Sequence, residues 1–160
     1  MIFITLGTQD KPFTRLLDRV EKLLETKKIK TRVVVQAGCT KYESKYMEIF
    51  ELLPMDEFEK LIASCDILIT HGGVGSIVTG LKKNKKVIAV ARRKKYGEHT
   101  NDHQLQIIKE FSKKGFIIPV EDVNDLERAL KKASTFQPKE YKSNTEKMVK
   151  TVEEQIERLY

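Results

Sequence analysis

The sequence predicts a single Rossmann-like α/β domain with a mostly parallel sheet. Short apolar segments rich in β-branched residues alternate with amphipathic segments, which is the pattern of strands joined by crossover helices. One such strand, residues 67–70, leads directly into a glycine-rich turn and a helix start. The length of 160 residues and the hydrophobic content of 40% suit one domain with its own core.

Six segments are expected to form strands because they are short, aliphatic and bounded by turn residues. They cover residues 2–6, 32–36, 47–53, 67–70, 87–91 and 116–120. Residues 67–70 (ILIT) show no polar alternation, as expected for a strand that is buried on both faces. Residues 47–53 alternate only weakly.

Helices are expected between these strands. They cover residues 13–25, 56–64, 101–114 and 122–133, and a further helix opens at residue 77. In the first helix, apolar residues recur every three or four positions, which buries one face. Residues 1–137 make up the domain. Residues 138–160 form a helical tail that packs on the domain or docks on a partner, because Met148, Val152 and Ile156 keep helical spacing.

The formal net charge is +7, and basic residues gather at 82–86 and 92–95. Such runs are usually solvated, and otherwise suit nucleotide phosphates, an anionic membrane surface or nucleic acid. Only Tyr96 adds an aromatic ring nearby, so no nucleic-acid partner is expected. The apolar start is too short for a signal peptide or a membrane span, and Cys39 and Cys65 are isolated, which together favour a cytoplasmic protein with reduced thiols.

The strand at residues 67–70 is followed by His71, Gly72, Gly73, Gly75 and Ser76. Glycines let a bound group approach the backbone, and the first turn of the next helix offers unpaired amides and the positive end of its dipole. This succession most often binds phosphate. The spacing is neither a P-loop nor the dinucleotide fingerprint, so another phosphate-bearing ligand is expected, with a simple connecting turn as the alternative.

The polar loop at residues 98–104 is a second candidate site. Its side chains suit several sugar hydroxyls, and they belong to Glu98, His99, Asn101, Asp102, His103 and Gln104. His99 and His103, with Glu98 or Asp102, could instead hold zinc, but no further compact ligand set is present, so no tightly bound metal is expected. Ligands of parallel sheets lie beyond the carboxyl ends of the strands, so the loops after the first, fourth and fifth strands should converge.

Three segments together resemble a known family: LGTQ with the following PF and RLL, the block THGGVGS, and KKYGEHTNDHQ. Over residues 1–133 the sequence is similar to the C-terminal, nucleotide-sugar-binding half of GT-B glycosyltransferases of family 28. It looks most like the small catalytic subunits of two-part β-1,4-glycosyltransferases that act on lipid-linked sugars. These subunits serve eukaryotic N-glycan assembly and bacterial capsule and exopolysaccharide synthesis.

The resemblance implies a UDP-sugar site. Thr8 and Gln9 match the loop that faces the diphosphate and the acceptor, and Met55, with Phe58 nearby, matches the place where backbone atoms meet uracil. The residues that match the diphosphate cradle and the loop touching ribose and sugar are His71, Gly72, Gly73, Gly75, Ser76, Glu98, His99, Asp102, His103 and Gln104. Thr79 departs from the family, which often has a ribose-binding Glu there, so Gln104 is expected to make that contact.

The implied reaction transfers galactose or N-acetylglucosamine from a UDP-sugar to a lipid-linked saccharide, with inversion at the anomeric carbon and no metal cofactor. Amides of residues 73–76, the helix dipole and a protonated His71 would stabilise the UDP leaving group, and His99 or Glu98 would act as base. The resemblance also implies a membrane-anchored partner subunit carrying the acceptor site, which puts the chain at the inner face of a membrane. A non-catalytic enhancer or UDP-sugar-binding subunit and a basic nucleic-acid module are the alternatives.

Overall fold

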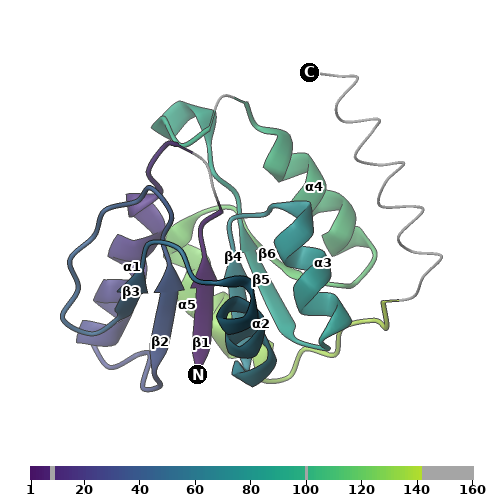
Figure 1. Ribbon diagram of the computed structural model, residues 1–160. Coiled ribbons are helices and arrows are strands. Elements are labelled where there is room, and N and C mark those ends of the chain that lie inside the picture. Colours follow the sequence, from purple (N-terminus) through teal and green to yellow (C-terminus); the bar gives the residue numbers. More distant parts are fainter. Residues whose placement is uncertain (8–9, 100, 142–160) are drawn as a thin grey trace.

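The computed structural model describes residues 1–7, 10–99 and 101–141. Its centre is a six-stranded sheet with parallel pairing throughout, in the order β3-β2-β1-β4-β5-β6 (Figure 1). The strands are β1 (Ile2–Thr5), β2 (Val33–Gln36), β3 (Glu48–Phe50), β4 (Ile67–Thr70), β5 (Lys86–Val90) and β6 (Ile118–Val120). The predicted Rossmann-like α/β fold is confirmed.

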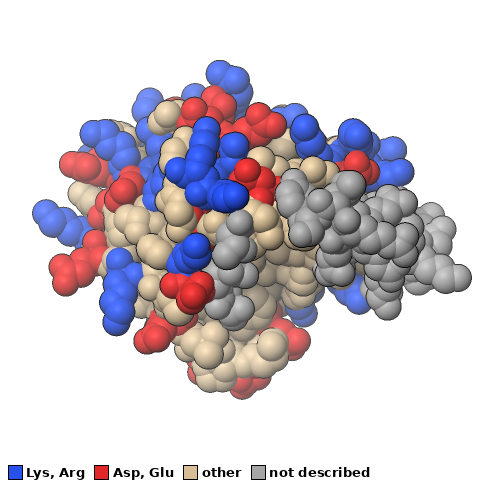
Figure 2. Space-filling view, turned by 90° about the horizontal axis from the view of Figure 1, so that it is seen from above, with Lys and Arg blue, Asp and Glu red and all other residues tan. Residues whose placement is uncertain are grey.

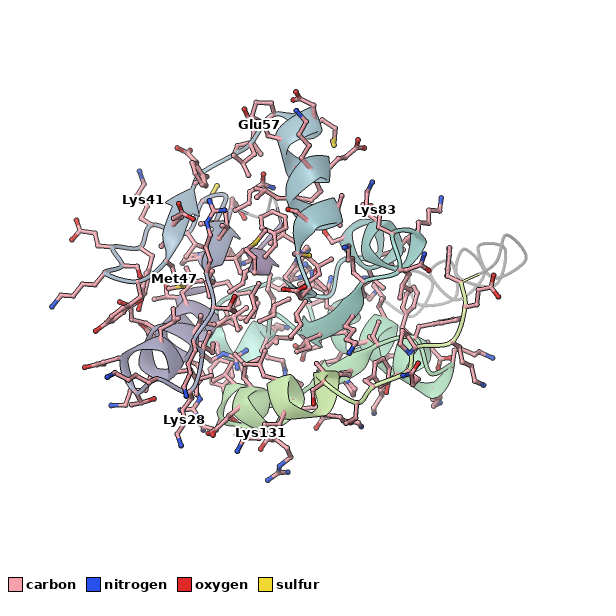
Figure 3. All side chains as sticks on the ribbon, turned by 90° about the horizontal axis from the view of Figure 1, so that it is seen from below. Lys28, Lys41, Met47, Glu57, Lys83 and Lys131 are labelled. Atoms are coloured by element: carbon pink, nitrogen blue, oxygen red, sulfur yellow. The ribbon has the colours of Figure 1, made fainter. Side chains whose placement is uncertain are left out.

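Helices cover both faces of the sheet. They are α1 (Thr14–Glu25), α2 (Met55–Ser64), α3 (Val74–Lys82), α4 (His103–Lys113) and α5 (Leu126–Ala133), with 3₁₀ turns η1 (Lys94–Tyr96) and η2 (Val123–Asp125). α1 and α5 share one core with Ile69 of β4, and α2, α3 and α4 share the other with Leu68, so β4 is buried on both faces as predicted. In Figure 3, Lys83 at the end of α3 and Lys131 on α5 project to opposite sides of the sheet.

The order of the strands puts a topological switch point beside β1. This strand pairs with β2 on one side and with β4 on the other, and Thr5 lies opposite both Gln36 and Thr70. α1 follows β1 on one face of the sheet, whereas α3 follows β4 on the other face. The two connections diverge and leave a crevice at the carboxyl ends of the strands, where the sequence predicts a ligand.

Several element boundaries differ from the predictions. The strand predicted at residues 47–53 is reduced to β3, an edge strand that pairs with β2. α3 begins at Val74 and not at residue 77, with Gly73 at its N-cap position and Gly75 in its first turn. The helix predicted at residues 122–133 begins instead as the 3₁₀ turn η2, where the Asp122 side chain accepts a hydrogen bond from Asn124 N.

The predicted C-terminal tail lies outside the described residues from residue 142 onward. Up to that point the chain follows the domain: Lys139 N donates to Gly115 O, and the Tyr141 ring packs against Phe116 with centroids 5.9 Å apart. None of the helices in the described ranges combines the length and the apolar character that a membrane crossing requires.

α3 lies unusually close to the sheet at Gly80. A Cβ atom at this position would lie 2.7 Å from Leu68 Cδ2 and 2.9 Å from Val87 Cγ2, and both neighbours are buried core side chains. Gly75, one and a half turns earlier in the same helix, has no atom within 4 Å of such a Cβ. The two glycines therefore differ in packing although they share a helix.

Gly80→Ala is expected to lower the free energy of unfolding by about 1–3 kcal/mol, because overpacking outweighs the better helix propensity of alanine. Gly75→Ala is the matched control, and it should raise the same quantity by up to about 1 kcal/mol. Urea-induced unfolding of the unliganded protein measures both. Equal effects of the two substitutions would contradict the close packing at Gly80.

Candidate functional site

The loops after β1, β4 and β5 converge at the crevice, as the sequence predicts. His71 N, after β4, donates to Thr5 O at 3.2 Å, and the His71 ring lies beside Gly7. Arg92, after β5, donates to Leu6 O from Nη2 at 2.6 Å and from Nε at 3.2 Å. The three loops thus form one connected rim.

A pocket of about 330 Å³ opens between α2 and the turn after β4. The described residues that line it are Thr5, Gly7, Gln36, Leu52, Leu53, Met55, Phe58, His71, Gly73, Gly75 and Ser76. The predicted donor-binding residues of α2 and the glycine turn therefore meet in one cavity, apart from Gly72. At Gly72, φ is +90° and a Cβ atom would lie 2.7 Å from Ile108 Cδ1 of α4. This glycine therefore packs against α4 and does not line the pocket.

The pocket has one polar wall and one apolar wall. On the polar side, the first hydrogen bond of α3 runs from Ile77 N to Gly73 O, so the amides of residues 74–76 have no acceptor within the helix. They lie at the positive end of the dipole of α3, which favours anions. On the apolar side, Phe58 packs edge-on against Phe3 with centroids 5.5 Å apart, and Leu53 N donates to Gln36 Oε1 at 2.9 Å. This combination suits a ligand with a flat apolar part and an anionic part.

The His71 ring is held between two glycines of different loops. A Cβ on Gly7 would lie 2.6 Å from His71 Nε2, and a Cβ on Gly73 would lie 2.5 Å from the same atom. Gly7 also has φ +78°, whereas φ at Gly73 is −71°, an angle that any residue adopts. The ring therefore occupies the space that side chains at these two positions would fill.

The His71 ring is neutral by itself at neutral pH, so the protonated ring expected at the diphosphate would need the negative charge of a bound anion. Burial, the charge of Arg92 and the nearby His99 lower its pKa to about 4, and a hydrogen bond to the Thr5 backbone opposes them only in part. Sequence position alone gives no measure of burial, and burial is the largest of these causes. At neutral pH the His71 ring therefore lines the site in its uncharged form.

Arg92 is a site residue that the sequence analysis missed, because it stands in the basic run 92–95. Only 1% of its surface is exposed. Besides Leu6 O, its guanidinium donates to Lys11 O at 2.6 Å and to Glu98 O at 3.1 Å, and it lies over the Phe13 ring at 5.2 Å. The charge is therefore dispersed over backbone carbonyls and an aromatic ring, and not over solvent.

Glu98 is buried in an ion pair and does not have the free carboxylate expected of a base. Its Oε2 and Oε1 accept hydrogen bonds from Arg15 Nε at 3.1 Å and Nη2 at 3.0 Å, and Oε1 also accepts from Arg93 N at 3.0 Å. Only 3% of the residue is exposed. Arg15 stands on α1, 83 positions away, so sequence inspection could not pair the two residues.

The other polar side chains of the loop accept hydrogen bonds from nearby backbone amides. Asn101 N donates to His99 Nδ1 at 3.2 Å, Asn101 Oδ1 accepts from His103 N at 2.9 Å, and Asp102 Oδ1 accepts from Lys94 N at 3.0 Å. Gln104 Oε1, expected at the ribose, instead accepts from Arg92 N at 3.2 Å.

The protonation state of His99 follows from its surroundings. Burial and the charge of Arg92 lower its pKa, so the ring is neutral at pH 7. Since Nδ1 accepts a hydrogen bond, the proton sits on Nε2, which makes His99 a hydrogen-bond donor toward a ligand. Acting as a base would require the opposite tautomer.

Within the described ranges, no group of three or more His, Cys, Asp or Glu side chains is arranged to hold a metal ion. The zinc alternative would also need Glu98 or Asp102, and Glu98 is bound to Arg15. Thr8 and Gln9, expected at the diphosphate and the acceptor, lie outside the described residues.

The family of the chain follows from comparison with known proteins. The model of the glycosyltransferase family 28 C-terminal domain matches residues 1–159. The chain belongs to this family. One relative of the family 28 domain, the UDP-N-acetylglucosamine transferase subunit ALG13 of Candida albicans, is 30% identical over 81 residues. That match covers 51% of this chain and 26% of the relative, so it spans about a quarter of the relative's length.

Solved structures share the fold. An NMR structure of ALG13 matches the family 28 domain with a TM-score of 0.63 at 19% identity, over 92% of this chain and 94% of that one. The kitacinnamycin glycosyltransferase matches with a TM-score of 0.63 at 14% identity, over 97% of this chain and 38% of its own. MurG of Acinetobacter baumannii matches with a TM-score of 0.58 at 13% identity, over 82% and 40%. The fold is that of the C-terminal half of a GT-B glycosyltransferase.

The low pKa of His71 predicts a loss of stability in acid. As the pH falls through 6.5, the ordinary pKa of histidine, His71 becomes protonated in the unfolded chain. In the folded chain the same ring becomes protonated only near pH 4. This difference should remove about 3 kcal/mol from the free energy of unfolding across that interval. Urea unfolding of wild type and His71→Gln between pH 7.5 and 4 measures it. The variant should lose less stability, and parallel curves would contradict the assignment.

Proposed function

We propose that this family 28 domain binds a UDP-sugar and transfers the sugar, with inversion, to a lipid-linked saccharide in polysaccharide synthesis. The observation that carries the proposal is the two-walled pocket at the switch point. Its volume of about 330 Å³ lies in the range of small-molecule sites. Leu53, Met55 and Phe58 offer an apolar wall for uracil, and Gly75 and Ser76 offer backbone amides for the diphosphate.

The transition state builds negative charge on the departing UDP. The amides of residues 74–76 and the dipole of α3 would stabilise that charge without a metal ion. The charge would also favour protonation of the neighbouring His71 ring, which is neutral beforehand. Such a ring interacts more strongly with the transition state than with the bound donor, which is the condition for lowering the barrier.

The acceptor's proton needs a base from elsewhere. Glu98 is held by Arg15, and the tautomer of His99 makes that ring a donor. We therefore propose that the base and the acceptor site come from a membrane-anchored partner subunit, with this chain at the cytoplasmic face as the donor-binding part. The word "subunit" in the name of the Candida relative supports a partner, and its UDP-N-acetylglucosamine favours that sugar over galactose.

Two alternatives are distinguishable. A non-catalytic UDP-sugar-binding or enhancer subunit would keep its effect on turnover when His71 is replaced by alanine. A nucleic-acid module would need a continuous basic surface, but Lys and Arg alternate with Asp and Glu on the visible part of the face above the strands (Figure 2).

Isothermal titration calorimetry tests the donor site. UDP should bind, and Gly73→Ala should weaken binding roughly tenfold or more, because the new Cβ displaces the His71 ring, which lines the pocket beside the amides. Gly80→Ala is the matched control: it crowds the same helix away from the pocket and should leave the affinity within about threefold in the folded protein. ADP should bind more weakly than UDP. No uptake of any uridine compound by wild type would reject the proposal.

The proposed association with a membrane-anchored partner is tested by removing the C-terminal tail. The proposal expects the full chain to sediment with membranes that contain the partner, and a chain lacking residues 144–160 to stay in the supernatant. UDP binding by the shortened chain, measured by calorimetry, controls for folding of the domain. Unchanged sedimentation of the shortened chain would reject the role of the tail.

A further inference from the structure

The Arg15–Glu98 pair is an ion pair with an unusual place in the fold. It joins the first turn of α1 to the start of the polar loop after β5, through two hydrogen bonds of 3.1 and 3.0 Å. The side chains are 19% and 4% exposed. Two charges withdrawn this far from water require good geometry and further hydrogen bonds, because desolvation opposes the pairing.

Arg15 has those further contacts. Its Nη2 also donates to Ala91 O at 3.2 Å, and its guanidinium lies 4.5 Å from the Tyr96 ring centroid and 5.5 Å from that of Phe13. Three groups around the loop after β5 therefore fix Arg15: the end of the strand, the η1 turn and the carboxylate of Glu98. These contacts hold the Arg15 guanidinium in the orientation in which it binds both carboxylate oxygens of Glu98.

Glu98 in turn determines where the polar loop begins. His99 follows it directly, and the bonds from Asn101 N to His99 Nδ1 and from His103 N to Asn101 Oδ1 link the described residues of the loop to one another. Near its far end, Gln104 is tied to Arg92 N. A shift of Glu98 would therefore displace His99 and Asn101 relative to the pocket, while Gln104 stays bound to Arg92 N and α2 and α3 need not move.

We propose that Arg15 and Glu98 are positioning residues: as a pair they set His99 and residues 101–104 against the sugar half of the donor, and neither touches the reacting atoms. This inference rests on the proposed function, because it presupposes that a UDP-sugar fills the site. It assigns Glu98 a role different from that of a base. It also gives Arg15, a residue of α1, a part in donor specificity.

The experiment compares two ligands on the same folded protein. Calorimetry with UDP and with UDP-N-acetylglucosamine is carried out on wild type, Arg15→Met, Glu98→Gln, the double variant and Arg15→Lys. We expect each single substitution to weaken the UDP-sugar about tenfold while UDP stays within about threefold. The double variant should bind no worse than either single one, because the pair acts as a unit. Arg15→Lys should lie in between, since lysine keeps the charge without the fork.

A matched control uses the exposed Arg32–Glu48 ion pair, where Arg32→Met and Glu48→Gln should change neither affinity. An unchanged UDP-sugar affinity in every Arg15 and Glu98 variant would overturn the inference. Equal weakening of the affinities for UDP and the UDP-sugar would also overturn it, because the pair would then be purely structural. A loss of UDP-sugar affinity in Glu98→Gln alone would overturn it too, because Glu98 would then contact the donor directly. If wild type binds no uridine compound, the proposed function itself fails, so the two failures are distinct.

Discussion

The buried guanidinium of Arg92 is the interaction on which the rest of the site depends. The carbonyls of Leu6 and Lys11 lie between β1 and α1, and that of Glu98 lies after β5, so Arg92 joins two connections that are far apart in the sequence. A lysine could not replace it, because its single ammonium group cannot reach all of these carbonyls, whereas the planar guanidinium presents several N–H donors. Burial is the main cause of the lowered pKa of His71 and of His99, and the charge of Arg92 adds to it, so the same group fixes the geometry of the crevice and helps to keep these two rings neutral.

The site divides into two parts that different elements build. Met55 and Phe58 of α2 and the amides of α3 form the pocket that suits a nucleotide, and Phe58 and Val74 pack against the core on one face of the sheet. The polar loop is held from the other face, through Arg15 of α1. Under the proposed function, this division would let the loop change with the sugar while the nucleotide pocket stays the same.

Patterns that repeat along the chain were predictable, and contacts between distant positions were not. Alternation of strands and helices was sufficient for the parallel sheet and for the convergence of its loops, because topology dictates where carboxyl ends meet. The sequence predicts the start of α3 three residues late, because Gly75 has a low helix propensity although the helix needs no side chain there. The burial of Arg92 inside a run of basic residues and the pairing of Glu98 with Arg15 depend on packing, and no local pattern encodes them.

The histidine held between two glycines has a consequence for how these positions vary across relatives. At position 73 the backbone is ordinary, and only the imidazole excludes a side chain, so a chain with a smaller residue at position 71 could carry alanine there. At position 7 the left-handed backbone demands glycine whatever stands at 71. Positions 71 and 73 should therefore covary, and position 7 should stay invariant beside them.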